Sequence, residues 1–131
     1  MTKNWKEEDL FNWIKEEYLS DLAMAINQFS RWDSYSLKSR IRIEFKCRSK
    51  HFDSLLIEKK KYDALISKSV PNKDIPYYIN STPEGVYAFK LEDLNPEWQT
   101  KQYPATTQFN NRRRVPKEVA FLDIELARKL K

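Results

Sequence analysis

The sequence predicts a mixed α/β domain with a central β-sheet. Residues 40–48, RIRIEFKCR, alternate strictly between charged and apolar side chains, which is typical of a β-strand with one buried face. Residues 5–18 instead carry apolar side chains at helical spacing. Residues 76–91 hold two apolar stretches around a turn that contains Pro and Gly, which indicates a hairpin. The length of 131 residues fits one domain.

The first predicted element is a helix over residues 5–18. Leu10, Ile14 and Tyr18 recur at helical spacing, and acidic residues occupy the first turn, where they favour a helix N-terminus. The apolar pattern also allows this helix to continue through Leu22 and Ile26. We therefore expect a helix at the N-terminus with an open C-terminal boundary.

Two strands are expected next. Residues 32–37 predict a short strand, and Lys38 and Ser39 predict a turn into the strand over residues 40–48. Successive side chains of a strand point to opposite faces, so strand 40–48 has an apolar face and a charged face. The apolar face carries Ile41, Ile43, Phe45 and Cys47, and the charged face carries Arg40, Arg42, Glu44, Lys46 and Arg48.

The second half of the chain predicts a helix, a hairpin and a C-terminal helix. Residues 55–66 suit a helix, although the letters LLI allow a brief strand first. The turn STPEG, with Gly85, separates two strands and completes the hairpin over residues 76–91. Residues 117–131 predict a helix after a short strand-like start.

Composition narrows the classes of function. The net charge of +5 and pI near 9.2 suit a polyanionic partner such as nucleic acid. Gly85 is the single glycine, which excludes the glycine-rich loops of P-loop and dinucleotide-binding proteins. One cysteine excludes a disulfide framework, and the chain lacks the long apolar run of a membrane span. We expect a soluble, intracellular protein without a membrane partner.

One group of residues has the chemistry of a hydrolytic site. Glu44 and Lys46 are two residues apart and share a strand face, and Asp33 lies on the preceding strand. Two neighbouring carboxylates suit a hard divalent cation such as Mg²⁺, which can activate water and neutralise phosphate charge. A lysine beside them can position that water or stabilise developing charge. Arginines on the same face suit phosphate binding.

The stretch WDSYSLKSRIRIEFKCR resembles the core motif of the PD-(D/E)XK nuclease superfamily, an Asp on one strand and Glu-x-Lys on the next. That superfamily includes restriction endonucleases, archaeal Holliday-junction resolvases and small phage nucleases. The resemblance spans about residues 5–91. It implies a restriction-endonuclease-like mixed β-sheet flanked by helices, with an α-β-β-α-β core. Residues 92–131 would be a C-terminal extension of a single nuclease-like domain, 1–131.

The resemblance also implies a function and site residues. It predicts a DNA endonuclease that uses Mg²⁺, with Mn²⁺ as a substitute, and a homodimer that cuts both strands. Asp33 and Glu44 would bind the metal, and Lys46 would assist the water. Glu17, with Glu16 as the alternative, would be the helix glutamate that many members add. Trp32, where the motif often has proline, departs from the pattern.

We expect the basic side chains near the motif and in the C-terminal segment to bind DNA. They are Arg40, Arg42, Arg48, Lys50, His51, Lys60, Arg112, Arg113 and Arg114. His51 also fits an ordinary loop histidine, and the three consecutive arginines also fit a solvated loop. A second Glu-x-Lys, Glu58-Lys59-Lys60, lies in the predicted helix, where such residues do not share a face. Two other functions stay open: a nucleic-acid-binding protein without catalysis, and a structural module.

Overall fold

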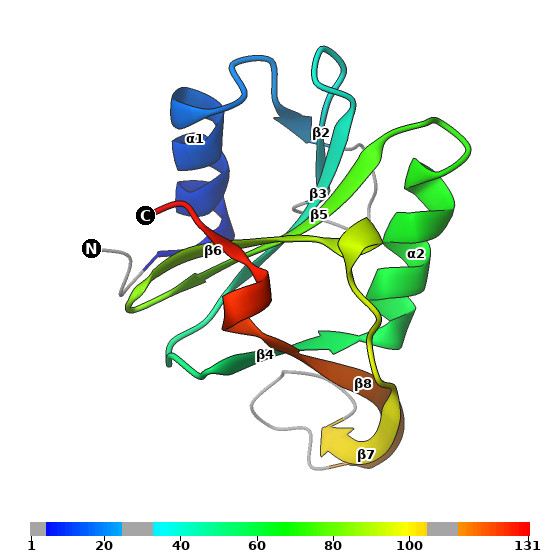
Figure 1. The fold of residues 1–131 in the computed structure, drawn as a ribbon. Helices are drawn as coiled ribbons and strands as arrows, with labels where there is room; N and C mark the ends of the chain where they lie inside the picture. The colour runs from blue at the N-terminus through cyan, green and yellow to red at the C-terminus, as the bar shows by residue number, and fades with distance from the viewer. Residues whose placement is uncertain (1–4, 25–32, 105–112) are drawn as a thin grey trace.

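The computed structural model describes residues 5–24, 33–104 and 113–131. These residues form a six-stranded sheet of order β1-β2-β3-β5-β6-β9, a three-stranded sheet of order β4-β8-β7, and helices α1 and α2 (Figure 1). The larger sheet comprises β1 (Ala23–Met24), β2 (Asp33–Ser36), β3 (Ile41–Cys47), β5 (Ile75–Thr82), β6 (Gly85–Lys90) and β9 (Arg128–Lys129). The remaining elements are α1 (Glu7–Glu17), β4 (Ser54–Glu58), α2 (Lys59–Ser69), η1 (Leu91–Asp93), β7 (Gln99–Pro104), β8 (Arg114–Asp123) and η2 (Ile124–Leu126). The predicted mixed α/β fold is confirmed.

Helix α1 ends at Glu17, and the chain after it continues to contribute to the same core. Leu10 and Ile14 are buried on one side of the helix. The N–H groups of Tyr18 and Leu19 both donate to the Ile14 carbonyl, which closes the last turn. Leu22 is buried in the same core from beyond the helix. The helix therefore does not continue through Leu22, and Ile26 lies outside the described residues.

Strand β3 lies at the centre of the molecule and has the two faces that the sequence predicts. Ile43 and Phe45 are buried with Leu10 and Ile14 of α1 in one core cluster. β2 pairs with β3 antiparallel and β5 pairs with it in parallel. Parallel neighbours require a crossover connection, and β4 with α2 provides it. Helix α1 consequently covers the apolar face of β3, and α2 lies on its charged side (Figure 1).

The segment predicted as a helix over residues 55–66 begins as strand β4 and continues as α2. The brief strand allowed by the letters LLI is thus present, and it extends into a pair with β8. The predicted hairpin is also present, because β5 and β6 pair antiparallel around the turn at Gly85. Gly85 has φ +152°, and a side chain there would collide with the carbonyl oxygen of Lys131.

The helix predicted over residues 117–131 is wrong. This segment forms most of β8, then η2 and β9. Buried Val119, Ala120 and Leu122 belong to the strand because β4 needs a partner, and Leu122 lies opposite Leu55 of β4. The C-terminal extension is therefore integrated in the fold: β8 is the central strand of the smaller sheet, and β9 pairs with β6.

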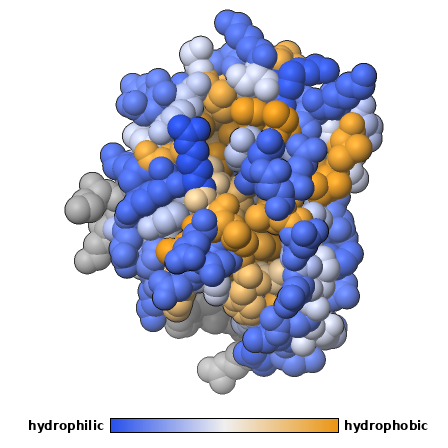
Figure 2. Space-filling view, in the orientation of Figure 1, coloured by the Kyte–Doolittle hydropathy of each residue, from blue (hydrophilic) through white to orange (hydrophobic). Residues whose placement is uncertain are grey.

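Hydrophobic residues gather in the middle of the molecular face seen in Figure 2, with hydrophilic residues around them. A cavity of about 180 Å³ lies between α1 and the larger sheet. Ile14, Ile43, Ile79 and Leu130 are among its lining residues, so it belongs to the apolar side of β3. Within the described part of the chain, neither helix is long and apolar enough to cross a membrane. The charged face of β3 lies on the opposite side of the strand from this cavity.

Candidate active site

Asp33 and Glu44 lie directly opposite each other on the antiparallel strands β2 and β3. Opposite residues of such a pair have Cα atoms about 4.5–5.5 Å apart and point to the same face of the sheet. Both side chains are mostly covered, with 16% of Asp33 and 17% of Glu44 exposed. The structure thus brings together the two carboxylates that the sequence places on consecutive strands.

Two lysines of α2 reach this carboxylate pair. The Lys61 Nζ lies 3.4 Å from the Glu44 Oε1, and the Lys68 Nζ lies 3.5 Å from the Asp33 Oδ2. Residues seven apart share one face of a helix, so α2 presents both lysines to the pair. Sequence reasoning missed both lysines and instead expected Lys60, which is exposed. Their spacing of seven indicates that they share a face of the helix, but it does not indicate that this face turns toward the sheet.

Lys46 stands on the same strand as Glu44, two residues further along. Its side chain is exposed, and its register partner is Asn80 of β5. The alternation of the strand places Lys46 and Glu44 on one face, about 6.6 Å apart along the strand. An ammonium group is therefore near the carboxylates and open to solvent.

The structure does not bring Glu17 or its alternative Glu16 to the pair. Both are exposed at the end of α1, and α1 packs against the opposite, apolar face of β3 through residues such as Ile14. Among the described residues, no group of three or more His, Cys, Asp or Glu side chains is placed to hold a metal ion.

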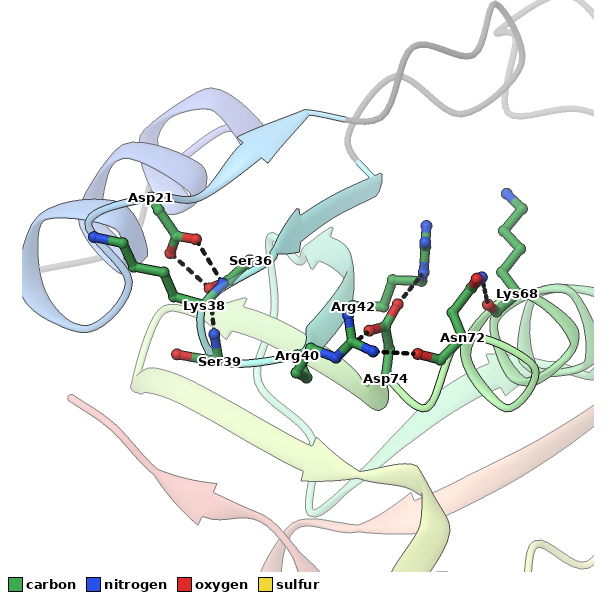
Figure 3. A network of polar contacts seen from close by, with 9 residues as sticks. All are labelled: Asp21, Ser36, Lys38, Ser39, Arg40, Arg42, Lys68, Asn72 and Asp74. Carbon is green, nitrogen blue, oxygen red and sulfur yellow. Dashed lines mark hydrogen bonds and ion pairs between the residues drawn. The ribbon is translucent and has the colours of Figure 1, made fainter.

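Arg40 and Arg42 are joined to the turn that precedes β5 (Figure 3). The Arg42 Nε donates to the Asp74 Oδ2 at 3.1 Å, and Arg40 lies 3.9 Å from the same carboxylate. Arg40 also donates to the Asn72 carbonyl, and Asn72 in turn donates to the backbone carbonyl of Lys68. This network ties the start of β3 to the end of α2, the helix that carries Lys68.

Arg48 contacts the interior of the protein. Its Nε donates to the Asn80 Oδ1 at 2.7 Å, and its Nη2 donates to the Leu56 carbonyl and the Tyr78 hydroxyl. The Tyr78 hydroxyl donates to the same Leu56 carbonyl, and burial raises the pKa of Tyr78. The guanidinium joins β3, β4 and β5, which favours a structural role for Arg48 over the expected DNA contact.

His51 lies away from the carboxylate pair. Its Nδ1 is 2.9 Å from the Thr82 Oγ1. Thr82 follows Tyr78, the partner of Glu44 on β5, by four residues, which is roughly 13 Å along a strand. Lys50, close to His51 in sequence, is exposed. The structure thus places these two residues beyond one end of the candidate site.

The basic run of the C-terminal segment is only partly described. Arg114 is exposed at the start of β8 and donates to the Gln102 carbonyl across the β7–β8 pair. Arg113 is also exposed, and Arg112 lies outside the described residues. Arg114 belongs to the smaller sheet, whereas Asp33 and Glu44 belong to the larger one.

Cys47 ends the apolar face of β3 and packs against the core cluster of α1. Burial raises the pKa of its thiol to about 11. Because the thiolate is the nucleophilic form, a thiol with this pKa is unreactive near neutral pH. Cys47 is therefore part of the packing, as the alternation of the strand predicts.

The donor set fits a hard divalent cation. Asp33 and Glu44 offer carboxylate oxygens, the ligands that Mg²⁺ and Mn²⁺ prefer. Mg²⁺ is commonly held in proteins by only one or two carboxylates, with the rest of its ligands from water and substrate phosphates. Two carboxylates from neighbouring strands meet this requirement. The single His and single Cys lie elsewhere, so the described donors do not suit zinc.

No protein-family model matches the sequence, and no curated protein matches it. Among solved structures, the chain is similar to Hjc, a Holliday junction resolvase from the archaeal hyperthermophile Archaeoglobus fulgidus. The TM-score is 0.58 at 14% sequence identity, over 95% of this chain and 88% of that chain. Hjc has the PD-(D/E)XK fold. The chain shares this restriction-endonuclease-like fold, as the sequence resemblance implies.

Proposed function

We propose that this protein is a metal-dependent DNA endonuclease. One observation carries the proposal: Asp33 stands directly opposite Glu44, with Lys46 on the same face, in a chain that shares the fold of a Holliday junction resolvase. The net charge of +5 agrees with a polyanionic substrate. Because Hjc is a resolvase, a four-way DNA junction is the first substrate to test.

Each side chain has a distinct task in this proposal. Asp33 and Glu44 hold Mg²⁺, which when bound supplies charge neutralisation at the phosphodiester and a more acidic water. The exposed ammonium of Lys46 orients the attacking water and stabilises the negative charge that develops on the phosphate. The largely exposed Arg40 binds neighbouring phosphates, with Lys50, Lys60, Arg113 and Arg114 as further contacts.

The decisive experiment is a cleavage assay. The purified protein is incubated with a four-way junction, supercoiled plasmid, linear duplex and single-stranded DNA, with Mg²⁺, Mn²⁺ or EDTA. We expect cleavage that requires the cation and that falls by about 100-fold or more in Asp33→Asn, Glu44→Gln and Lys46→Met. The matched control is Glu58→Gln, the glutamate of the second Glu-x-Lys, whose carboxylate pairs with Lys117. This control should cut like the wild type.

The absence of cleavage on all four substrates with either cation would reject the endonuclease. The basic charge then favours a DNA-binding protein without catalysis, whose affinity falls steeply with salt. A slope near zero would leave a structural module. The homodimer stays a prediction, which sedimentation equilibrium tests directly.

A further inference from the structure

The two lysines of α2 hold positions that the sequence motif does not account for. Lys61 and Lys68 contact Glu44 and Asp33, the two residues that the proposed function assigns to the metal. Their own side chains are 49% and 40% exposed, whereas the carboxylates are mostly covered. Ion pairs with this much exposure contribute little to the stability of a fold. The fold therefore gains little stability from these lysines, which indicates that their role lies in the site.

The charges at the site suggest what the lysines do. The charges of two carboxylates and two ammonium groups sum to zero. Asp33, Glu44, Lys61 and Lys68 are therefore neutral together as long as the lysines stay in contact. A divalent cation at the same oxygens adds two positive charges and competes with both ammonium groups. The released ammonium groups then face the site. Asp33, Glu44, the two lysines and the cation together carry a net charge of +2, which DNA phosphates balance.

We propose that Lys61 and Lys68 are two further residues of this site, with two successive partners. They neutralise Asp33 and Glu44 in the metal-free protein, and they bind DNA phosphates once a divalent cation takes their place. This inference rests on the proposed function, because it assumes that the carboxylate pair is the metal site. In the metal-free protein, DNA therefore approaches a group of four residues without net charge. After the cation has bound, DNA approaches a group with positive net charge.

The two lysines lie at different points along one face of α2. Residues seven apart lie about 10.5 Å apart along a helix, and each lysine contacts a different carboxylate of the pair. Two phosphates of one DNA strand, one for each ammonium group, would therefore bind on either side of the carboxylate pair. A scissile phosphate at the carboxylate pair would lie between the two that the lysines bind. Lys61 and Lys68 are then positioning residues for the substrate strand.

The first test measures Mn²⁺ binding in the absence of DNA, by electron paramagnetic resonance of the free ion. We expect Lys61→Met and Lys68→Met to bind Mn²⁺ at least threefold more tightly than the wild type, because a competitor is gone. Lys59→Met is the matched control: it removes a lysine from the same helix whose ammonium pairs with Asp63, at 2.8 Å. It should bind Mn²⁺ like the wild type.

Glu44→Gln separates the two hypotheses. If this variant binds Mn²⁺ as well as the wild type does, the cation is not held at the pair, and the metal site of the proposed function fails. If Glu44→Gln weakens binding but Lys61→Met and Lys68→Met match the Lys59→Met control, only the lysine inference is overturned.

The second test measures affinity for a four-way DNA junction against salt, with Ca²⁺ or with EDTA. With Ca²⁺, Lys61→Met and Lys68→Met should each lower the slope of log affinity against log salt by about 1, the loss of one phosphate contact. With EDTA they should change it much less, because the carboxylates already neutralise these lysines. Equal changes of slope in Ca²⁺ and EDTA would show that the cation does not release the lysines.

Discussion

The two faces of strand β3 differ in what they do for the molecule. On one face Ile43 and Phe45 are only 1% and 4% exposed and pack against α1. On the other face, Arg42 and Glu44 contact side chains from the turn before β5 and from α2. Apolar burial contributes far more to folding than half-exposed ion pairs do. Stability and candidate chemistry therefore lie on opposite faces of one strand and are separable by mutation.

The largest expected effect is on the apolar face. Ile43→Ala removes a buried side chain that borders the cavity beside α1, and it should lower the free energy of unfolding by about 2–5 kcal/mol. Glu44→Gln, one position along, should change the same quantity by less than about 1 kcal/mol. Urea denaturation followed by circular dichroism measures both. Similar losses in the two variants would show that the faces are not separable.

Both faces of β3 could be predicted from the sequence, because each depends only on residues that are close together in the chain. Strict alternation assigns the side chains of Ile41–Cys47 to the two faces of β3, and the turn at residues 37–40 is short enough to set the register between β2 and β3. The opposition of Asp33 and Glu44 follows from that turn. The restriction-endonuclease-like fold was expected from the resemblance of this stretch to the PD-(D/E)XK core motif, and the structure confirms it.

Other features depend on contacts between distant parts of the chain. The segment after Lys117 has a helix-compatible composition, yet it forms β8 because Leu55 of β4, 67 residues before its partner Leu122, requires pairing. The same applies to Lys61 and Lys68, which reach the carboxylates only because the crossover places α2 over β3. No local pattern reveals which face of α2 turns toward the sheet.

A substitution at Arg48 tests whether this residue belongs to the interior of the protein or to the DNA-binding face. Arg48→Met should lower the free energy of unfolding by about 2 kcal/mol, because it removes hydrogen bonds to a charged group and leaves Asn80 and Tyr78 with fewer partners. It should leave the salt dependence of DNA binding unchanged. Lys50→Met, an exposed site two residues later, is the control for stability. A reduced salt slope with unaltered stability would instead assign Arg48 to DNA binding.

The smallest expected effect is a change in the free energy of unfolding with pH, and it concerns Cys47. Burial raises the pKa of its thiol from 9.0 to about 11, so the folded protein holds this proton more tightly than the unfolded chain does. The resulting stabilisation is complete below pH 9 and is lost as the pH rises from 9 to about 11.

Other groups also titrate in this range, so the informative quantity is the difference in unfolding free energy between the wild type and Cys47→Ala. That difference should change between pH 9 and 11 in the direction that weakens the wild type, and it should stay level from pH 6 to 8. In the native protein at pH 8, iodoacetamide should modify Cys47 much more slowly than in the unfolded chain. A thiol that reacts equally fast in both states would be a solvent-facing group, and the apolar face of β3 would then end at Phe45 rather than at Cys47.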